Sequence, residues 1–181
     1  METFRLLAHP AAPANKVKAA TVELNYSESD CKFLLRYFVS GADDLNLPQC
    51  EPPGRRDRLW EKTCFELFVQ REGFEPYYEF NFSPSTQWAA YKFDRYREGM
   101  QDLELCAEPH IKRGNLEAGH VIDVDIDLAP FPDAPLRLGL SAVIEETDGT
   151  KSYWALAHPA GKPDFHHKDC FALTLPAPET R

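Results

Sequence analysis

Short runs of alternating apolar and polar residues, separated by proline and glycine, restrict the fold of this chain more than any other feature. In segment 121–128 the residues after Val121 alternate between aliphatic residues and aspartates; the aliphatic ones are Ile122, Val124, Ile126 and Leu128. Successive side chains of a strand point to opposite faces of a sheet, so this run predicts a strand with one buried face. No long segment keeps the period of an amphipathic helix. We therefore expect an all-β fold.

Similar strand-like runs cover most of the chain. They occupy segments 22–26, 31–39, 63–70, 76–83, 87–93, 121–128, 136–144, 153–157 and 171–175. The 15 prolines and 9 glycines supply turns between them. About ten or eleven short strands at this spacing are typical of a two-sheet antiparallel β-sandwich. With 181 residues, of which 43% are hydrophobic, the chain 1–181 is expected to form a single domain.

Charge and cysteine usage exclude several classes of protein. The formal net charge is -9, which disfavours binding to nucleic-acid phosphates or to anionic membranes. The 5 cysteines are widely spaced and include no Cys-x-x-Cys pair, so neither a disulfide framework nor a zinc site is indicated. The amino-terminal residues lack the pattern of a signal peptide, and no apolar run is long enough to span a bilayer. We expect a cytoplasmic protein that binds a neutral or cationic ligand.

The most informative stretch is a predicted hairpin that spans 63–83. Phe65, Leu67 and Val69 share one face of its first strand, so Glu66 takes the other. On the second strand the face opposite the phenylalanines carries Tyr77, Glu79 and Asn81. Aromatic rings between carboxylates and an amide suit a sugar, because rings pack on C–H faces while polar groups bind hydroxyls. Periodicity alone also fits an ordinary solvated sheet face.

Three segments resemble the DOMON-like superfamily, and family 9 carbohydrate-binding modules in particular. They are LWEKTCFELFV, then YYEFNFSPSTQWAAYKF, and finally SYWALAHPAGKPDFHHKDCFALTL, which together span residues from about 58 to 175. The resemblance implies a β-sandwich whose concave face or loop rim binds a sugar, and we expect a non-catalytic ligand-binding domain. By position, Trp60 and Glu66 match a binding aromatic and a binding carboxylate, and Trp154 is a second aromatic wall. Further polar contacts would come from Glu79, Asn81 and Lys92.

Two other functions stay open at this point. Some relatives in the superfamily bind haem, which needs axial ligands such as a methionine with a histidine, and the chain has only Met1 and Met100. We expect no cofactor. Other relatives occur beside enzymes of cell-wall or sugar metabolism, so a protein-interaction domain with a protein partner is the second alternative.

Metal binding and catalysis have weaker support. The loop 158–169 gathers His158, His166 and His167 with two aspartates, but its spacing matches no short metal motif. Glu66 and Glu79 could form the carboxylate pair that glycosidases use, although two glutamates on neighbouring strands are expected by chance in so acidic a chain. No nucleophile elbow, phosphate-binding loop or zinc-protease motif is present. We expect no enzyme activity.

Overall fold

A computed structural model describes residues 1–27, 32–41, 45–128 and 135–177, and nearly all of its regular structure is β. The strands are β1 (Glu2–Ala8), β2 (Ala19–Ser27), β3 (Lys32–Ser40), β4 (Gly54–Arg55), β5 (Cys64–Arg71), β6 (Tyr77–Phe82), β7 (Gln87–Phe93), β8 (Gln101–Asp102), β9 (His110–Leu116), β10 (Gly119–Asp127), β11 (Leu136–Glu145), β12 (Lys151–Ala155) and β13 (Leu173–Leu175). Two short 3-10 turns, η1 (Leu59–Glu61) and η2 (Lys168–Cys170), are the helical elements of the described residues. The expected all-β class is confirmed.

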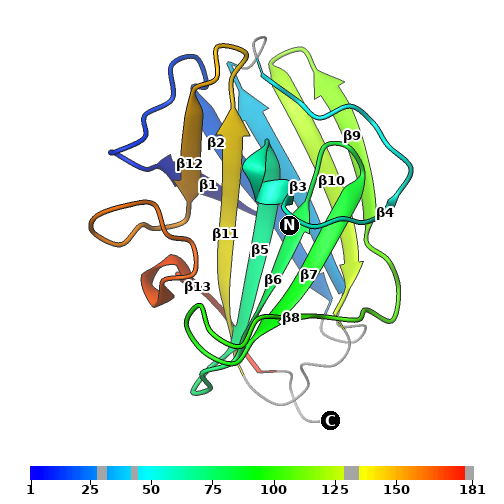
Figure 1. Cartoon of the computed structure of the whole chain (residues 1–181), viewed down its shortest axis with the longest axis vertical. Coiled ribbons are helices and arrows are strands. Elements are labelled where there is room, and N and C mark those ends of the chain that lie inside the picture. Colours follow the sequence, from blue (N-terminus) through cyan, green and yellow to red (C-terminus); the bar gives the residue numbers. More distant parts are fainter. Residues whose placement is uncertain (28–31, 42–44, 129–134, 178–181) are drawn as a thin grey trace.

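All thirteen strands of the described residues belong to one hydrogen-bonded sheet, in the order β4-β7-β6-β5-β11-β12-β1-β2-β3-β10-β9. Strand β13 pairs with β11, and β8 pairs with β7, beside this path. The sheet curls so that two parts face each other (Figure 1). We call β1, β2, β3, β10 and β9 the β3 half, and the remaining strands the β5 half. The pairing is antiparallel except between β4 and β7, which makes the sheet mixed.

Strand β1 joins the two halves and corrects the expectation of two separate sheets. Its residues 2–6 pair with β2, whereas Leu7 and Ala8 pair with β12. One strand therefore contributes to both halves, which is how a curled sheet passes round a corner without a break in its hydrogen bonds. Segment 2–8 was not among the predicted strands, because its alternation is irregular. The sequence pattern thus indicated the layers but missed the strand that connects them.

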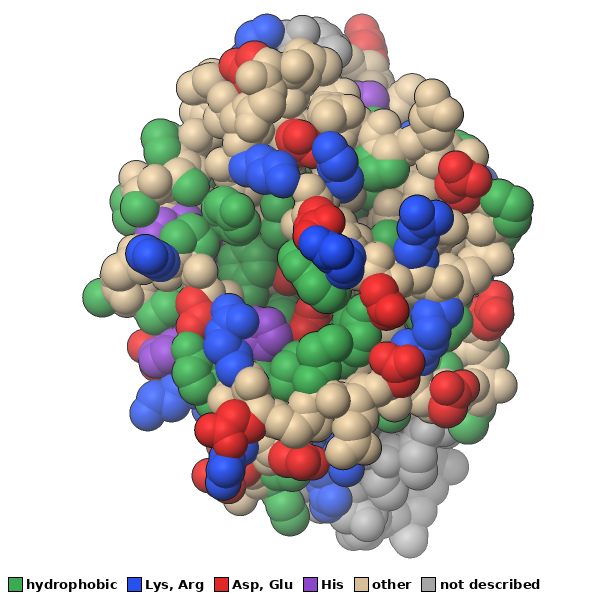
Figure 2. Space-filling view, in the orientation of Figure 1, with side chains coloured by type: hydrophobic (Ala, Val, Ile, Leu, Met, Phe, Trp, Pro, Cys, Tyr) green, Lys and Arg blue, Asp and Glu red, His purple; other side chains and the backbone are tan. Residues whose placement is uncertain are grey.

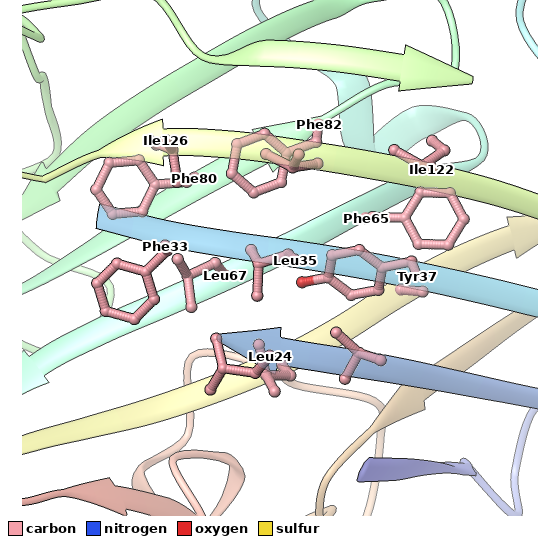
Figure 3. Close-up of a cluster of buried hydrophobic side chains, with 14 of the residues drawn as sticks. Leu24, Phe33, Leu35, Tyr37, Phe65, Leu67, Phe80, Phe82, Ile122 and Ile126 are labelled. Carbon is pink, nitrogen blue, oxygen red and sulfur yellow. The ribbon is translucent and has the colours of Figure 1, made fainter. Parts of the chain in front are cut away.

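The main core lies between the two halves and confirms the predicted alternation. From β5 and β6, Phe65, Leu67 and Phe80 point inward and are at most 3% exposed. They meet Leu35 and Tyr37 of β3, as the close-up of this cluster shows (Figure 3). Aliphatic residues of β10 also enter this core, while Asp123 and Asp125 on its other face form ion pairs with residues of β3. Burial of these apolar side chains is the main source of stability for such a fold.

A buried hydrogen bond also links the two halves. The hydroxyl of Tyr37 donates to the backbone carbonyl of Glu66 over 2.7 Å, and its ring lies 5.0 Å from that of Phe65. Tyr37 has no measurable exposure, so its hydroxyl needs this partner. The bond therefore fixes the distance between strand β3 and the backbone of β5 at Glu66.

The proline-rich segment that follows β3 crosses to the β5 half. Its described part begins with Leu45, which bridges to Glu146, and continues to β4, which pairs alongside β7. It ends at Arg58, whose φ of 62° turns the chain into η1. Apart from β4, most of its described part has no regular secondary structure. Its course decides where Trp60 of η1 lies.

The cysteines of the described residues are free. Cys64 and Cys170 are buried, and Cys50 and Cys106 are exposed. Cys31 and the start of the predicted strand 31–39 lie outside the described residues. No helix of the described ranges has the length and apolar character needed to cross a membrane.

The Tyr37 hydrogen bond yields a prediction about stability. The Tyr37→Phe substitution should lower the free energy of unfolding by about 1–2 kcal/mol, because the Glu66 carbonyl would lose a buried donor. Urea denaturation followed by fluorescence measures this loss. Tyr153→Phe is the matched control, because no hydrogen bond of the Tyr153 hydroxyl is found among the described residues, and its midpoint should not move. Equal midpoints for Tyr37→Phe and the unsubstituted protein would contradict the role of the bond.

Candidate ligand-binding cavity

A cavity of about 380 Å³ opens on the outer face of the β5 half, on the side of β5 and β6 away from the main core. Its lining consists of Trp60, Glu66, Phe68, Glu79, Phe93, Arg97, Met100, Val143, Tyr153, Pro163, Asp164, Phe165 and His166. In Figure 2 a hollow lies near the centre of this face, with hydrophobic side chains around it and acidic and histidine side chains at its bottom. The volume falls within the range of small-molecule sites.

Strand alternation places two glutamates at the bottom of this cavity. Glu66 of β5 lies opposite Ser141 of β11 on one side and Asn81 of β6 on the other. Glu79 of β6 lies opposite Phe68 of β5. All five side chains share the face that does not enter the main core, as the hairpin pattern predicted for the four residues of β5 and β6.

This face is not the solvated surface that a simple alternating pattern suggests. Phe68, Tyr77 and Tyr91 form a second apolar cluster on it, together with Phe165 and Phe171 from the segment that follows β12. That segment, residues 156–172, contains η2 and lies beside β11 (Figure 1), and we call it the covering segment. The ring of Phe171 stacks on Phe68 with centroids 5.6 Å apart.

Gly139 of β11 allows this close packing. A Cβ at position 139 would lie 2.9 Å from the Phe171 ring and 3.2 Å from the Cβ of Phe68. A side chain there would push the covering segment away from the sheet. Because the covering segment packs closely on the sheet, Glu66 is only 3% exposed to solvent and Glu79 only 5%.

Neither glutamate forms an ion pair with a lysine or arginine of the described residues. Glu66 accepts a hydrogen bond of 2.9 Å from the Ser141 hydroxyl, and Glu79 accepts one of 2.8 Å from the Asn81 amide. Burial raises the pKa of both carboxyl groups well above the usual range, and the charge of Glu79 raises the pKa of Glu66 further. Near neutral pH the pair therefore retains protons that exposed glutamates would release.

His166 forms one wall of the cavity and is held by the groups beneath it. Its Nδ1 lies 2.8 Å from the Tyr77 hydroxyl, which also accepts a bond from the Arg97 backbone N–H. With Tyr77 donating to Nδ1, the neutral ring carries its proton on Nε2, which faces a carboxylate oxygen of Glu79 at 3.6 Å. Burial lowers the pKa of His166 to about 4, so the ring is neutral at physiological pH.

At the rim the charges compensate each other. Arg97 donates to Asp164 with an Nη2–Oδ1 distance of 2.7 Å, and the Tyr96 hydroxyl donates to the same carboxylate. These bonds tie the turn after β7 to the covering segment. The pair closes one side of the cavity.

Trp60 also lines the cavity. It is 37% exposed, and its indole meets the Tyr91 ring edge-on with centroids 6.0 Å apart. The Tyr91 hydroxyl is in turn held by Asp57 at 2.8 Å. A partly exposed, positioned indole beside a cavity can pack against a flat apolar ligand face.

The structure brings most of the predicted site residues together. Trp60, Glu66 and Glu79 line the cavity. Tyr77 and Asn81 lie directly behind it, where Tyr77 supports His166 and Asn81 supports Glu79. These two are supporting residues rather than wall residues.

Two of the predicted site residues lie elsewhere. Lys92 is opposite Tyr78 and therefore on the core-facing side of β7, because register places it in the row of Phe80 and Ala90. Trp154 is 5% exposed within the main core, and its Nε1 donates to the Ser152 hydroxyl. Period-two alternation puts both residues on the wrong face for this cavity, so we remove them from the candidate site.

Sequence reasoning missed several wall residues. Phe93, Tyr153 and Phe165 were regarded as strand or loop residues, and Arg97 was not considered. His166 was noticed, but as part of a metal loop. The Tyr-Tyr-Glu-Phe pattern predicted the floor of the site, whereas no local pattern marks the segment that covers it.

The described residues of the cavity and of the histidine loop do not fit a metal or a haem. Within the described ranges no three His, Cys, Asp or Glu side chains are grouped closely enough to hold a metal ion. His158 and His166 contact different partners, Leu7 and Tyr77. Met100 and His166 do line the same cavity, but both ring nitrogens of His166 already face protein groups, so a methionine–histidine pair for haem iron is not arranged.

Comparisons with known proteins give structural neighbours only. No model of a known protein family matches the sequence, and no curated protein matches it. A crystal structure of a proposed carbohydrate-binding protein from Bacteroides uniformis aligns with a TM-score of 0.70 at 16% identity, covering 98% of this chain and 86% of that one.

A family 9 carbohydrate-binding module from Caldicellulosiruptor kristjanssonii also matches. Its complex with cellotriose aligns with a TM-score of 0.56 at 12% identity over 88% of this chain and 74% of that one. Its complex with glucose aligns with a TM-score of 0.52, also at 12% identity, over 83% and 72%. At these identities the similarity shows that the chain has the fold of carbohydrate-binding modules.

The buried carboxyl pair predicts an unusual pH dependence of stability. Because the folded state holds protons that the unfolded chain releases from a pKa of about 4.3, the pair's contribution to stability is complete below that pH and is lost as the pH rises. The Glu66→Gln variant has no such charge to bury. Its stability relative to the unsubstituted protein should therefore increase by about 1 kcal/mol or more between pH ~4 and slightly alkaline pH.

Urea titrations at several pH values measure this difference. His166 contributes with the opposite sign, because its lowered pKa makes the unfolded state bind more protons between about 4 and ~6.5. Its contribution is present in both proteins and largely cancels in the difference. Glu117→Gln, an exposed change in the turn between β9 and β10, is the control and should show no pH-dependent gain. A flat difference for Glu66→Gln would contradict the buried pair.

Proposed function

We propose that this chain is a non-catalytic carbohydrate-binding domain that takes a short saccharide into the cavity above Glu66 and Glu79. The observation that carries this proposal is the combination of hydrogen-bonding carboxyl groups at the bottom with aromatic walls. Glu66 and Glu79 offer oxygens to sugar hydroxyls, and Trp60 and Tyr153 offer ring surfaces to C–H faces.

The preorganisation of the polar groups supports binding. The Ser141 and Asn81 hydrogen bonds hold the two carboxyl groups, and Tyr77 holds the ring of His166. Side chains that are already fixed lose little conformational entropy when a ligand arrives. The cavity volume of about 380 Å³ is at the small end of ligand sites, which suits one or two sugar rings rather than a long chain.

The structural neighbours support the same ligand class. Family 9 modules of the same fold have known structures in complex with glucose and with cellotriose. We extend that ligand class to this chain as part of the proposal, together with membership of the DOMON-like superfamily and a cytoplasmic location. The affinity expected of such a module is micromolar to millimolar, about 4–8 kcal/mol.

Removal of the exposed indole tests the proposal. Trp60→Ala should weaken the binding of glucose or cellotriose by about tenfold or more, because the ligand loses an aromatic contact surface. Isothermal titration calorimetry or ligand-detected NMR measures the loss. The thermal midpoint should change by only a few degrees, since Trp60 is partly exposed and its indole meets Tyr91 only edge-on.

Phe74→Ala is the matched control for this experiment. Phe74 is an aromatic residue with 52% exposure in the turn between β5 and β6, and it does not line the cavity. Its removal should leave sugar binding unchanged. If no saccharide binds the unsubstituted protein, or if Trp60→Ala binds as well as Phe74→Ala, the proposed function is wrong.

A further inference from the structure

The cavity has an imbalance of charge that a neutral ligand does not resolve. Its lining includes three carboxyl groups, those of Glu66, Glu79 and Asp164. Among the residues that the structure describes, the lining includes one arginine or lysine, Arg97. Arg97 is engaged by Asp164 at the rim, at 2.7 Å. When ionised, the two glutamates at the bottom therefore have no partner of opposite charge on the described wall.

The groups packed around the two glutamates cannot supply that charge. Strand β11 offers the Ser141 hydroxyl, β6 the Asn81 amide, and the covering segment a neutral His166. The side chains of Cys64 on β5 and Tyr37 on β3 are also buried nearby, and neither type of group carries positive charge. The long-range field of Arg97 lowers the pKa of Glu79 only in part, because burial is the larger effect.

Bringing two carboxyl groups together away from water and leaving them without a cation is unfavourable. Such an arrangement persists at functional sites, where the missing partner arrives with the ligand. The remaining walls are suited to a cation as well. Trp60, Phe93 and Tyr153 present aromatic rings to the same cavity, and ring faces attract ammonium groups.

We propose that the ligand recognised in this cavity carries a protonated amine on a saccharide ring, so that its ammonium group lies between Glu66 and Glu79. This inference rests on the proposed function and specifies the substrate class of the same site. The ammonium donates to the carboxylate oxygens, the aromatic walls surround its C–H neighbours, and the ring hydroxyls reach the rim formed by Arg97 and Asp164. Binding converts the protonated pair into ionised carboxylates and releases protons.

Calorimetry with matched sugars tests this inference. Glucose, glucosamine and N-acetylglucosamine share one ring, but only glucosamine carries a cationic nitrogen. At mildly acidic pH, where that amine is protonated, glucosamine should bind at least about tenfold more tightly than the other two. Titrations in buffers of different ionisation enthalpy should show protons released when glucosamine binds and none when glucose binds.

Glu66→Gln provides the second arm of the experiment. It keeps the shape of the side chain and a hydrogen-bonding oxygen for Ser141, but it halves the negative charge available to the ammonium. The preference for glucosamine over glucose should fall toward one, and proton release should diminish. Glu117→Gln, the exposed control, should retain the preference and the proton release.

Each outcome separates this inference from the proposed function. If glucose binds as tightly as glucosamine, the proposal of a cationic ligand is wrong, but the proposed carbohydrate-binding function is retained. If cyclohexylamine binds and no sugar does, the ammonium site stands and the carbohydrate function is wrong. If none of these compounds binds, both are wrong. A preference for glucosamine that survives Glu66→Gln undiminished would also overturn the inference.

Discussion

Strands β5 and β6 have to be buried on both faces, and the rest of the site depends on this constraint. Their inner face carries Phe65 and other apolar residues, which form the main core against β3. Their outer face carries Phe68 and Tyr77, which would be exposed to water if the sheet ended there. The segment after β12 covers these rings and contributes Phe165 and Phe171. This covering segment is held by aromatic contacts but leaves the middle of the face open. The result is a cavity instead of a second continuous core.

Burial by this cover changes the chemistry of the polar residues beneath it. On a solvated sheet face, Glu66 and Glu79 would be ordinary ionised side chains with little effect on binding. Below Phe165 and His166 they lose water, and the pKa of each rises. The same desolvation lowers the pKa of His166 to about 4. One structural feature therefore accounts for a protonated acid pair and a neutral histidine in the same cavity.

Much of the fold could be predicted because strand alternation is a local property. The hairpin of β5 and β6, the strand β10 and the inward direction of Phe65 were all expected from period-two patterns and were found. Strand β1 was missed because its alternation is irregular. Its change of partner within seven residues is a tertiary feature: Leu6 is the last residue paired with β2, and Leu7 is the first paired with β12. Lys92 and Trp154 were assigned to the site by resemblance, but they lie on the core-facing side, which depends on register across strands.

The sequence by itself determined which residues form strands and which side chains share a face, because both follow from the geometry of neighbouring residues along one strand. It therefore predicted that Glu66, Glu79 and their polar neighbours lie on one face. Only the tertiary structure decided that this face is covered and that Arg97 forms its ion pair with Asp164. It also decided that the two glutamates share a cavity in which no lysine or arginine of the described residues pairs with them. These properties depend on contacts between segments far apart in the chain, and no local period records such contacts.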